Sequence, residues 1–229
     1  QHKYYADFSV AMPYSTKLPT GNRVAFSPTV TLGWNLANEK FLENSIFDNL
    51  MLTASVGIIN QDLDITASDN EDGYYLYKTV VQKGGWYSWG DSDGLAATEF
   101  QRGNNPDMTY VKRKEFTAGL RGSMCSNLIN FDINFFTSKM DGGLVRPGSL
   151  YPNYFTQIGY PSSSIIPYVN FNVDQRTGFD FSVYANKKVG EVDLTLGVSG
   201  MYYKSTAKKR DENIEFSYLS AVGLSLIHI

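Results

Sequence analysis

Aromatic rings in glycine- and proline-rich surroundings are the residues of this sequence best suited to bind a ligand. Residues 84–94, GGWYSWGDSDG, carry Trp86, Tyr87 and Trp89, whose flat faces can stack on sugar rings or on peptide side chains. Residues 146–171 contain four prolines, which predict a stiffened, ordered loop. We predict substrate contacts for six residues, with packing inside the loops as the alternative role for each: Trp86, Tyr87, Trp89, Arg146, Tyr151 and Tyr154.

Catalytic and metal chemistry have little support in the sequence. The two histidines, His2 and His228, lie near opposite ends, and the HExxH, GxSxG and phosphate-loop motifs are missing. The single cysteine, Cys125, excludes an intramolecular disulfide and a multi-cysteine metal site. We therefore expect no enzyme activity, no cofactor and no metal. A formal net charge of -3 also argues against nucleic acid as a partner.

The elements that must position these loops are predicted to be strands with one apolar and one polar face. In RVAFSPTVTLGWN, residues 23–35, apolar residues occupy every second position, a period of two that is typical of a strand. The pattern predicts about eight strands of roughly 9–13 residues, longer than the ~5–6 of ordinary globular strands and near the ~9–11 of tilted membrane strands. The pattern recurs in segments 4–12, 50–58, 115–122, 129–135, 178–185 and 191–203, and a last strand is predicted from 214–218.

Lipid is the predicted neighbour of the apolar positions. Hydrophobic residues make up 42% of the chain, slightly below the ~45–50% of globular proteins, so they are not in excess. What distinguishes them is their alternation with polar residues along the strands. On the apolar parity, Lys112, Lys114, Lys139 and Lys204 lie outside the apolar stretch, each at the long-loop end of its strand. The residues predicted to face lipid are Phe26, Val30, Leu32, Trp34, Leu52, Val56, Leu120, Phe131, Ile133, Phe181, Leu194 and Leu196.

Two further sets of residues follow from this placement. Aromatic residues near strand ends predict a girdle at the membrane interface, made of Tyr4, Trp34, Tyr110, Tyr202 and Tyr218. Polar residues on the opposite parity are expected to line a hydrated lumen, among them Thr29, Thr53, Asp132, Asp180 and Asp193.

The connections between the predicted strands alternate in length. Short connections at 36–49, 123–127 and 186–190 alternate with long ones at 60–107 and 141–175. Outer-membrane barrels have short turns at one end and long loops at the other. The fold class predicted is an all-β, antiparallel transmembrane β-barrel. A soluble extracellular β-sandwich that binds carbohydrate and a passive porin are the alternatives.

Several stretches resemble the SusC/RagA-type TonB-linked outer-membrane transporters of Bacteroidetes. NRVAFSPTVTLGWNLANEKFL (22–42) resembles that family's F-x-P-S-x-S-L-G-W strand with its E-K-F turn, and DNLMLTASVGIINQD (48–62) is similar to its L-K-L-R-A-S-Y-G strand. Segments 104–144 and 172–206 resemble later strands of the family in the same order. Val56 replaces a usual tyrosine, and Gln175, Arg176 and Thr177 also depart from the pattern.

The resemblance implies a TonB-dependent importer in the bacterial outer membrane. Such a protein has a 22-stranded barrel with a plug, takes a large nutrient such as a glycan or peptide from a SusD-like surface lipoprotein, and draws energy from TonB–ExbB–ExbD. We expect residues 1–229 to be a segment of the barrel domain that lacks the plug, the TonB box and the signal peptide. The closing LSLIHI resembles translated sequencing adapter. An isolated arc would leave two unpaired strand edges, so we do not expect this segment to transport on its own.

Overall fold

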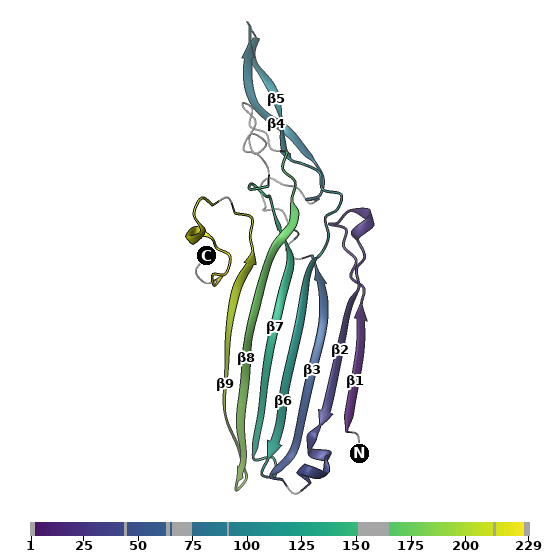
Figure 1. Ribbon diagram of the computed structural model, residues 1–229, viewed down its shortest axis with the longest axis vertical. Coiled ribbons are helices and arrows are strands. Elements are labelled where there is room, and N and C mark those ends of the chain that lie inside the picture. The colour runs from purple at the N-terminus through teal and green to yellow at the C-terminus, as the bar shows by residue number, and fades with distance from the viewer. Residues whose placement is uncertain are drawn as a thin grey trace.

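The chain forms long antiparallel strands joined by turns and irregular connections (Figure 1). The computed structural model describes residues 3–43, 45–62, 65, 75–90, 92–150, 165–212 and 214–226. None of the helical turns in these ranges is long or apolar enough to span a membrane. The strands are β1 (Tyr4–Ala11), β2 (Ser27–Asn35), β3 (Phe47–Gln61), β4 (Val80–Trp89), β5 (Ser92–Arg102), β6 (Val111–Met124), β7 (Ile129–Val145), β8 (Val169–Val189) and β9 (Val192–Lys209). The 3₁₀ turns are η1 (Thr20–Asn22), η2 (Leu36–Asn38), η3 (Lys40–Leu42) and η4 (Ser217–Leu219).

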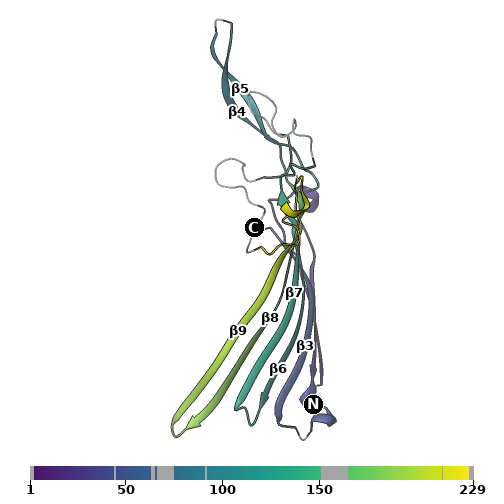
Figure 2. The ribbon, with the colours of Figure 1, turned by 60° about the vertical axis from the view of Figure 1, so that its left-hand side comes forward.

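Seven of these strands form one open sheet in the order β1-β2-β3-β6-β7-β8-β9, in which every neighbouring pair is antiparallel. The sheet twists and curves along its length (Figure 2). Strands β4 and β5 form a separate two-stranded hairpin, which extends beyond the sheet in both views. This arrangement confirms the predicted all-β, antiparallel fold class.

Long and short connections lie at opposite ends of the sheet, as the sequence predicted. At one end, named here the loop end, the chain runs through segments 12–26, 62–110 and 146–168. At the other, named the turn end, segments 36–46, 125–128 and 190–191 join the strands. Gln61 pairs with Val111, so the chain leaves the sheet for the β4–β5 hairpin and returns at directly opposed positions.

The cross-strand register gives the sheet one apolar and one polar face. Side chains alternate between the two faces along a strand, so a shared register places like residues in rows across the sheet. One row on the apolar face contains Ala6, Leu32, Ala54, Ala118, Phe135, Phe179 and Tyr202. A row on the polar face contains Ser9, Thr29, Gly57, Glu115, Ser138, Arg176 and Ser205.

A small hydrophobic core ties the loop-end connections together. The loop core is defined here as Leu18, Ile65, Leu76, Met108 and Tyr110, all of which are buried. The hydroxyl of Tyr110 donates to the backbone oxygens of residue 23, at 2.6 Å, and of residue 13, at 3.3 Å. Burial raises the pKa of Tyr110 above its ordinary value. The prediction that Tyr110 belongs to an interfacial girdle is therefore wrong, because the connections fold back over its ring.

Two further expectations about strands differ from the structure. The long connection predicted at 60–107 contains a β-hairpin, formed by β4 and β5. Segment 214–218 was expected to begin a strand, but it ends in the 3₁₀ turn η4, which places Tyr218 outside any strand. The chain turns back beyond η4: Ala207 N donates to Leu224 O at 3.1 Å and Gly223 N donates to Ala207 O at 2.7 Å. This return pairs residues 223–226 with the edge of β9, beside which they lie in Figure 1.

Candidate functional site

The residues predicted to face lipid lie together on the apolar face. Trp34, Leu52, Leu120, Ile133 and Phe181 form a single row across five strands. The other members of the set, Val30, Leu32, Val56, Phe131, Leu194 and Leu196, lie on the same face, and Phe26 is exposed just before β2. Leu196 is 81% exposed and Leu32 is 54% exposed, which leaves a broad apolar surface uncovered by the described residues. Contact of this surface with lipid stays a prediction.

Charged residues on the apolar face border a band that carries none. On β7 the apolar-face positions from Ile129 to Thr137 are uncharged, and Lys139 follows them toward the loop end. Nine residues at about 3.3 Å each, tilted by about 40°, span about 20–25 Å, close to the ~25 Å apolar band of membrane barrels. Lys112, Lys114 and Lys204 also lie at the loop end, as predicted.

At the turn end, Glu39 joins the first two strands through its side chain. Lys3 Nζ lies 2.9 Å from Glu39, and Trp34 Nε1 and the Tyr4 hydroxyl donate to it at 3.1 and 3.2 Å. The rings of Tyr4 and Trp34 stack with centroids 6.2 Å apart. The hydrogen bond from Lys3, followed by that from Trp34, holds the pKa of Glu39 below its ordinary 4.5. The two aromatic residues predicted for a girdle here thus share one carboxylate.

The lowered pKa of Glu39 predicts a specific loss of stability in acid. A carboxylate with a lower pKa in the folded state contributes stability above its unfolded pKa, and this stability is lost as pH falls through the folded pKa. We expect Glu39→Gln to lower the melting temperature of the full-length parent protein at pH 7, and this difference to shrink as pH falls from the ordinary 4.5 through the lowered pKa of Glu39. Thermal melts in detergent from pH 3 to 7 measure it, with exposed Glu43→Gln as the matched control. A difference that is constant across this range would contradict the assignment.

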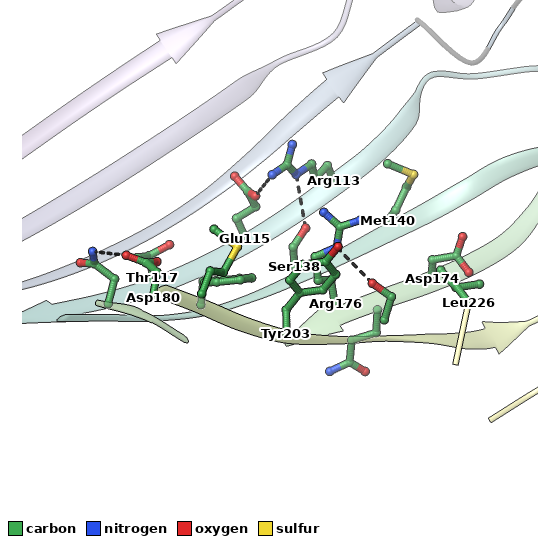
Figure 3. Close-up of a pocket in the computed structure, with 15 residues that line it drawn as sticks. Arg113, Glu115, Thr117, Ser138, Met140, Asp174, Arg176, Asp180, Tyr203 and Leu226 are labelled. Atoms are coloured by element: carbon green, nitrogen blue, oxygen red, sulfur yellow. Dashed lines mark hydrogen bonds and ion pairs between the residues drawn. The ribbon is translucent and has the colours of Figure 1, made fainter. Parts of the chain in front are cut away.

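The polar face carries a pocket of about 650 Å³ toward the loop end of β6 to β9 (Figure 3). On β6, Arg113 forms an ion pair with Glu115 and donates to Ser138 Oγ on β7 at 3.3 Å. On β8, Arg176 donates to Ser205 Oγ at 3.1 Å, and its guanidinium carbon lies 4.8 Å from the centre of the Tyr203 ring. The pocket therefore offers both signs of charge beside an aromatic face.

A hydrogen-bonded network continues along the polar face toward the turn end. Asn134 donates to Asp132 at 2.8 Å and to Asp180 at 2.9 Å. Arg121 completes it with an ion pair to Asp132 at 2.6 Å. The predicted lumen residues Thr29, Thr53, Asp132, Asp180 and Asp193 all occupy the polar parity of their strands. Parity predicted Asp180. Arg113, Glu115, Arg176 and Tyr203 were not predicted, although they occupy the polar parity of their strands.

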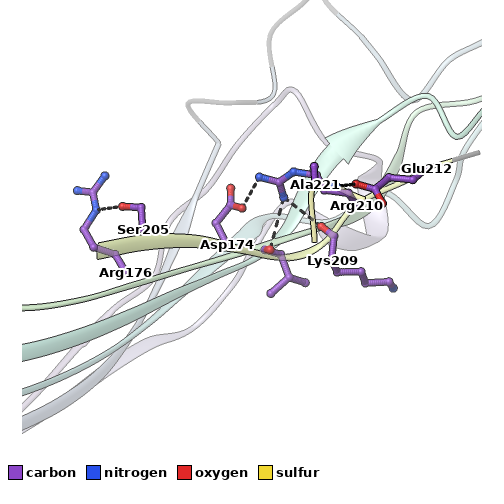
Figure 4. Close-up of polar contacts among 8 residues, drawn as sticks. Asp174, Arg176, Ser205, Lys209, Arg210, Glu212 and Ala221 are labelled. Carbon is purple, nitrogen blue, oxygen red and sulfur yellow. Dashed lines mark hydrogen bonds and ion pairs between the residues drawn. The ribbon is translucent and has the colours of Figure 1, made fainter. Parts of the chain in front are cut away.

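The end of β9 is closed by a second set of charged contacts (Figure 4). Arg210 pairs with Asp174 on β8 and donates to the backbone oxygens of Val173 and Lys209, at 3.4 and 3.0 Å. Glu212 accepts from Ala221 N at 2.7 Å. These contacts hold the segment after β9 against the sheet and border the pocket at Asp174.

The structure describes the predicted substrate contacts unevenly. Trp86, Tyr87 and Trp89 lie on β4 of the hairpin, with side chains outside the described set. Tyr151 and Tyr154 lie outside the described residues. Arg146 donates to Gln101 O at 2.7 Å, and its guanidinium carbon lies 5.7 Å from the centre of the Tyr168 ring. Arg146 thus links β5 to the β7–β8 connection, and its contact with substrate stays a prediction.

These features define a class of protein structure. A curved antiparallel meander with one apolar face, one polar face and all long connections at one end is the form of a β-barrel wall, here an open arc with β1 and β9 as its edges. In the described parts of the chain, no three His, Cys, Asp or Glu side chains are grouped to hold a metal ion.

Solved structures with this fold include chains of the RagAB peptide importer. In its "closed-closed" state the match has a TM-score of 0.67 at 20% identity and covers 93% of this chain and 21% of that chain. In the "open-open" state the TM-score is 0.69 at 20% identity, over 94% and 21%. A third structure, of the RagAB peptide transporter, gives 0.67 at 22% identity over 90% and 21%. The chain thus spans about a fifth of the length of the structures it matches.

The likeness confirms, at the level of the fold, the resemblance to SusC/RagA-type transporters. No protein-family model matches the sequence. A search of curated proteins found no similar sequence either.

Proposed function

We propose that this chain supplies barrel wall and extracellular loops to an outer-membrane active importer of a large nutrient. The observation that carries the proposal is the charge-free apolar band that continues across seven strands, backed by a polar face with a mixed-charge pocket. The fold shared with chains of the RagAB peptide importer supports the same function and favours a peptide over a glycan. A pocket with both signs of charge also suits the termini and side chains of a peptide.

The proposed mechanism is capture at the loop end followed by passage along the polar face. Trp86, Tyr87 and Trp89 would contact the nutrient first, together with Arg146, Tyr151 and Tyr154. A SusD-like surface lipoprotein would deliver it, a role that the two-component name RagAB supports. A plug elsewhere in the full-length protein would then rearrange under TonB–ExbB–ExbD. The segment described here would act as wall and scaffold in these steps, not as an enzyme.

The two alternative functions make different structural demands. A soluble carbohydrate-binding sandwich needs a second sheet over the apolar face. The second sheet among the described residues is the β4–β5 hairpin, and it extends past the loop end without covering that face. A passive porin shares the wall but has no plug, so the upstream sequence of the parent protein distinguishes it from an active importer.

The test of the proposal is the environment of two adjacent side chains on β2. Val30 pairs with Val56 on the apolar face, and Thr29 pairs with Gly57 on the polar face. Each is changed to Cys in the full-length parent and given a nitroxide label, and collision with oxygen and with a water-soluble nickel chelate is measured in bilayers. We expect high oxygen and low nickel access at position 30, and the reverse at position 29. Low access to both reagents at position 30 would indicate a protein-packed core and favour the sandwich.

A further inference from the structure

Four exposed lysines gather on the apolar face at the loop end of the sheet. Lys112 and Lys114 lie on β6, Lys139 on β7 and Lys204 on β9, and they are named here the lysine belt. They lie in three adjacent rows next to the uncharged band. At the turn end, Lys187 lies on the same face opposite neutral Leu194. The positive charge of the apolar face is therefore concentrated at the loop end.

The belt contains a pair of directly opposed like charges. Lys114 and Lys139 are directly opposite each other on neighbouring strands, a position in which like charges destabilise a sheet. Asp141 lies 3.7 Å from Lys114, and both side chains are at least 40% exposed, so this ion pair is weak. Within the described residues, Lys112, Lys139 and Lys204 form no ion pair. An anion placed among these ammonium groups would relieve the repulsion.

The surface beside the belt suits an anion that also carries an apolar chain. A hollow of about 500 Å³ is lined by Lys112 and Lys114 on one side and by Val24, Phe26 and Ile58 among its other residues. Val24 and Phe26 are both more than half exposed. Ammonium groups next to exposed apolar side chains match the phosphate and the adjoining hydrocarbon of a lipid.

We propose that the lysine belt binds the phosphate groups of anionic lipid headgroups in the leaflet that adjoins the loop end. This inference rests on the proposed function, because it requires the apolar face to be in a bilayer. Basic side chains at the edge of a membrane-spanning surface attract anionic lipids, and the attraction is screened by salt. The belt would thereby fix the depth of the wall in the membrane as well as select its lipid neighbours.

The test compares two lipids at one position next to the belt. Thr137 lies opposite Thr177, in the row that also holds Lys204. In the full-length parent, with Cys125→Ser and without other reactive cysteines, Thr137→Cys carries a bimane label. Quenching of the label is measured in phosphatidylcholine vesicles that contain increasing dibrominated phosphatidylglycerol or dibrominated phosphatidylcholine. We expect about a fivefold local preference for phosphatidylglycerol at low salt, the effect of roughly one cationic side chain at an anionic surface.

The two opposed lysines of the belt are then neutralised with Lys114→Gln and Lys139→Gln, which should lower the preference toward one. The control, Lys187→Gln with Lys188→Gln, removes two positive charges at the turn end, one from each face, and should leave the preference unchanged. Equal quenching by both lipids, or an equal loss of preference in the control, would overturn the inference while leaving the label in lipid. Quenching by neither lipid would contradict the proposed function itself.

Discussion

Val198→Arg should destabilise the full-length protein in a membrane by about 2–4 kcal/mol, whereas Ser199→Arg should be tolerated. Val198 is 63% exposed on the apolar face, in the row of Phe131 and Val183. It lies six residues from Val192 at the turn end and six from Lys204 at the loop end, near the middle of the uncharged band. A charge at the midplane of a lipid-facing strand costs about 2–4 kcal/mol.

The neighbouring substitution is the control, because it changes the same strand at the opposite face. Ser199 pairs with Ser182, which pairs with Asp132, so position 199 lies on the polar face, where a charge is compatible with water. Surface substitutions of this kind change stability by about 0.5 kcal/mol or less. Urea unfolding in lipid vesicles, together with the amount of folded protein recovered from membranes, measures both variants. Equal loss of stability in the two variants would contradict a lipid-facing role for the apolar face.

Leu18→Ala should loosen the loop end while the wall keeps its stability. Leu18 is fully buried in the loop core with Ile65, Leu76 and Met108. Truncating a buried leucine to alanine costs about 2–5 kcal/mol, because contacts are lost and a cavity remains. The loop core is built from connections, so the cost should fall on their local unfolding and not on the sheet.

Hydrogen exchange followed by mass spectrometry separates these two effects. In Leu18→Ala we expect faster exchange in segments 13–25 and 103–110, since Asn22 Nδ2 donates to Met108 O across the core at 3.0 Å. Segment 129–137 of β7 should exchange as before. Thr20→Ala, which changes an exposed residue of the same connection, should leave all three segments unchanged. Equal acceleration in 129–137 would mean that the loop core is part of the wall's cooperative unit.

The wall could be predicted from the sequence because its chemistry is local. A strand between an apolar and a polar environment must alternate apolar and polar side chains. In INFDINFF, residues 129–136, this alternation identifies both faces of the strand without information on any other segment. Connection lengths then placed the long loops at one end. The β4–β5 hairpin was not predicted, because its alternation of apolar and polar residues is interrupted by register shifts. These shifts lie between Lys83 and Trp86 and between Tyr87 and Trp89.

The predictions that were wrong depend on contacts between residues distant in sequence. Tyr110 is an aromatic residue near a strand end, as expected of a girdle residue, but it is buried in one cluster with Leu18 and Ile65. No local sequence pattern predicts that these residues lie close to Tyr110. The contacts within the polar-face pocket could not be predicted from the sequence for the same reason. The parity of Arg176 is visible in the sequence, whereas its contacts with Ser205 and Tyr203 require the register of β8 against β9.

The pairing of Gln61 with Val111 has a consequence for engineering. The chain leaves and rejoins the sheet at opposed positions, so the pairing of β3 with β6 holds the two ends of the intervening segment together. Lengthening this segment therefore adds little to the entropic cost of closing the loop. Its hairpin extends past the sheet without covering either face. The junction is therefore a natural site for grafting: a foreign epitope or binding peptide inserted there would be displayed outward on a wall whose hydrogen-bond ladder is left intact.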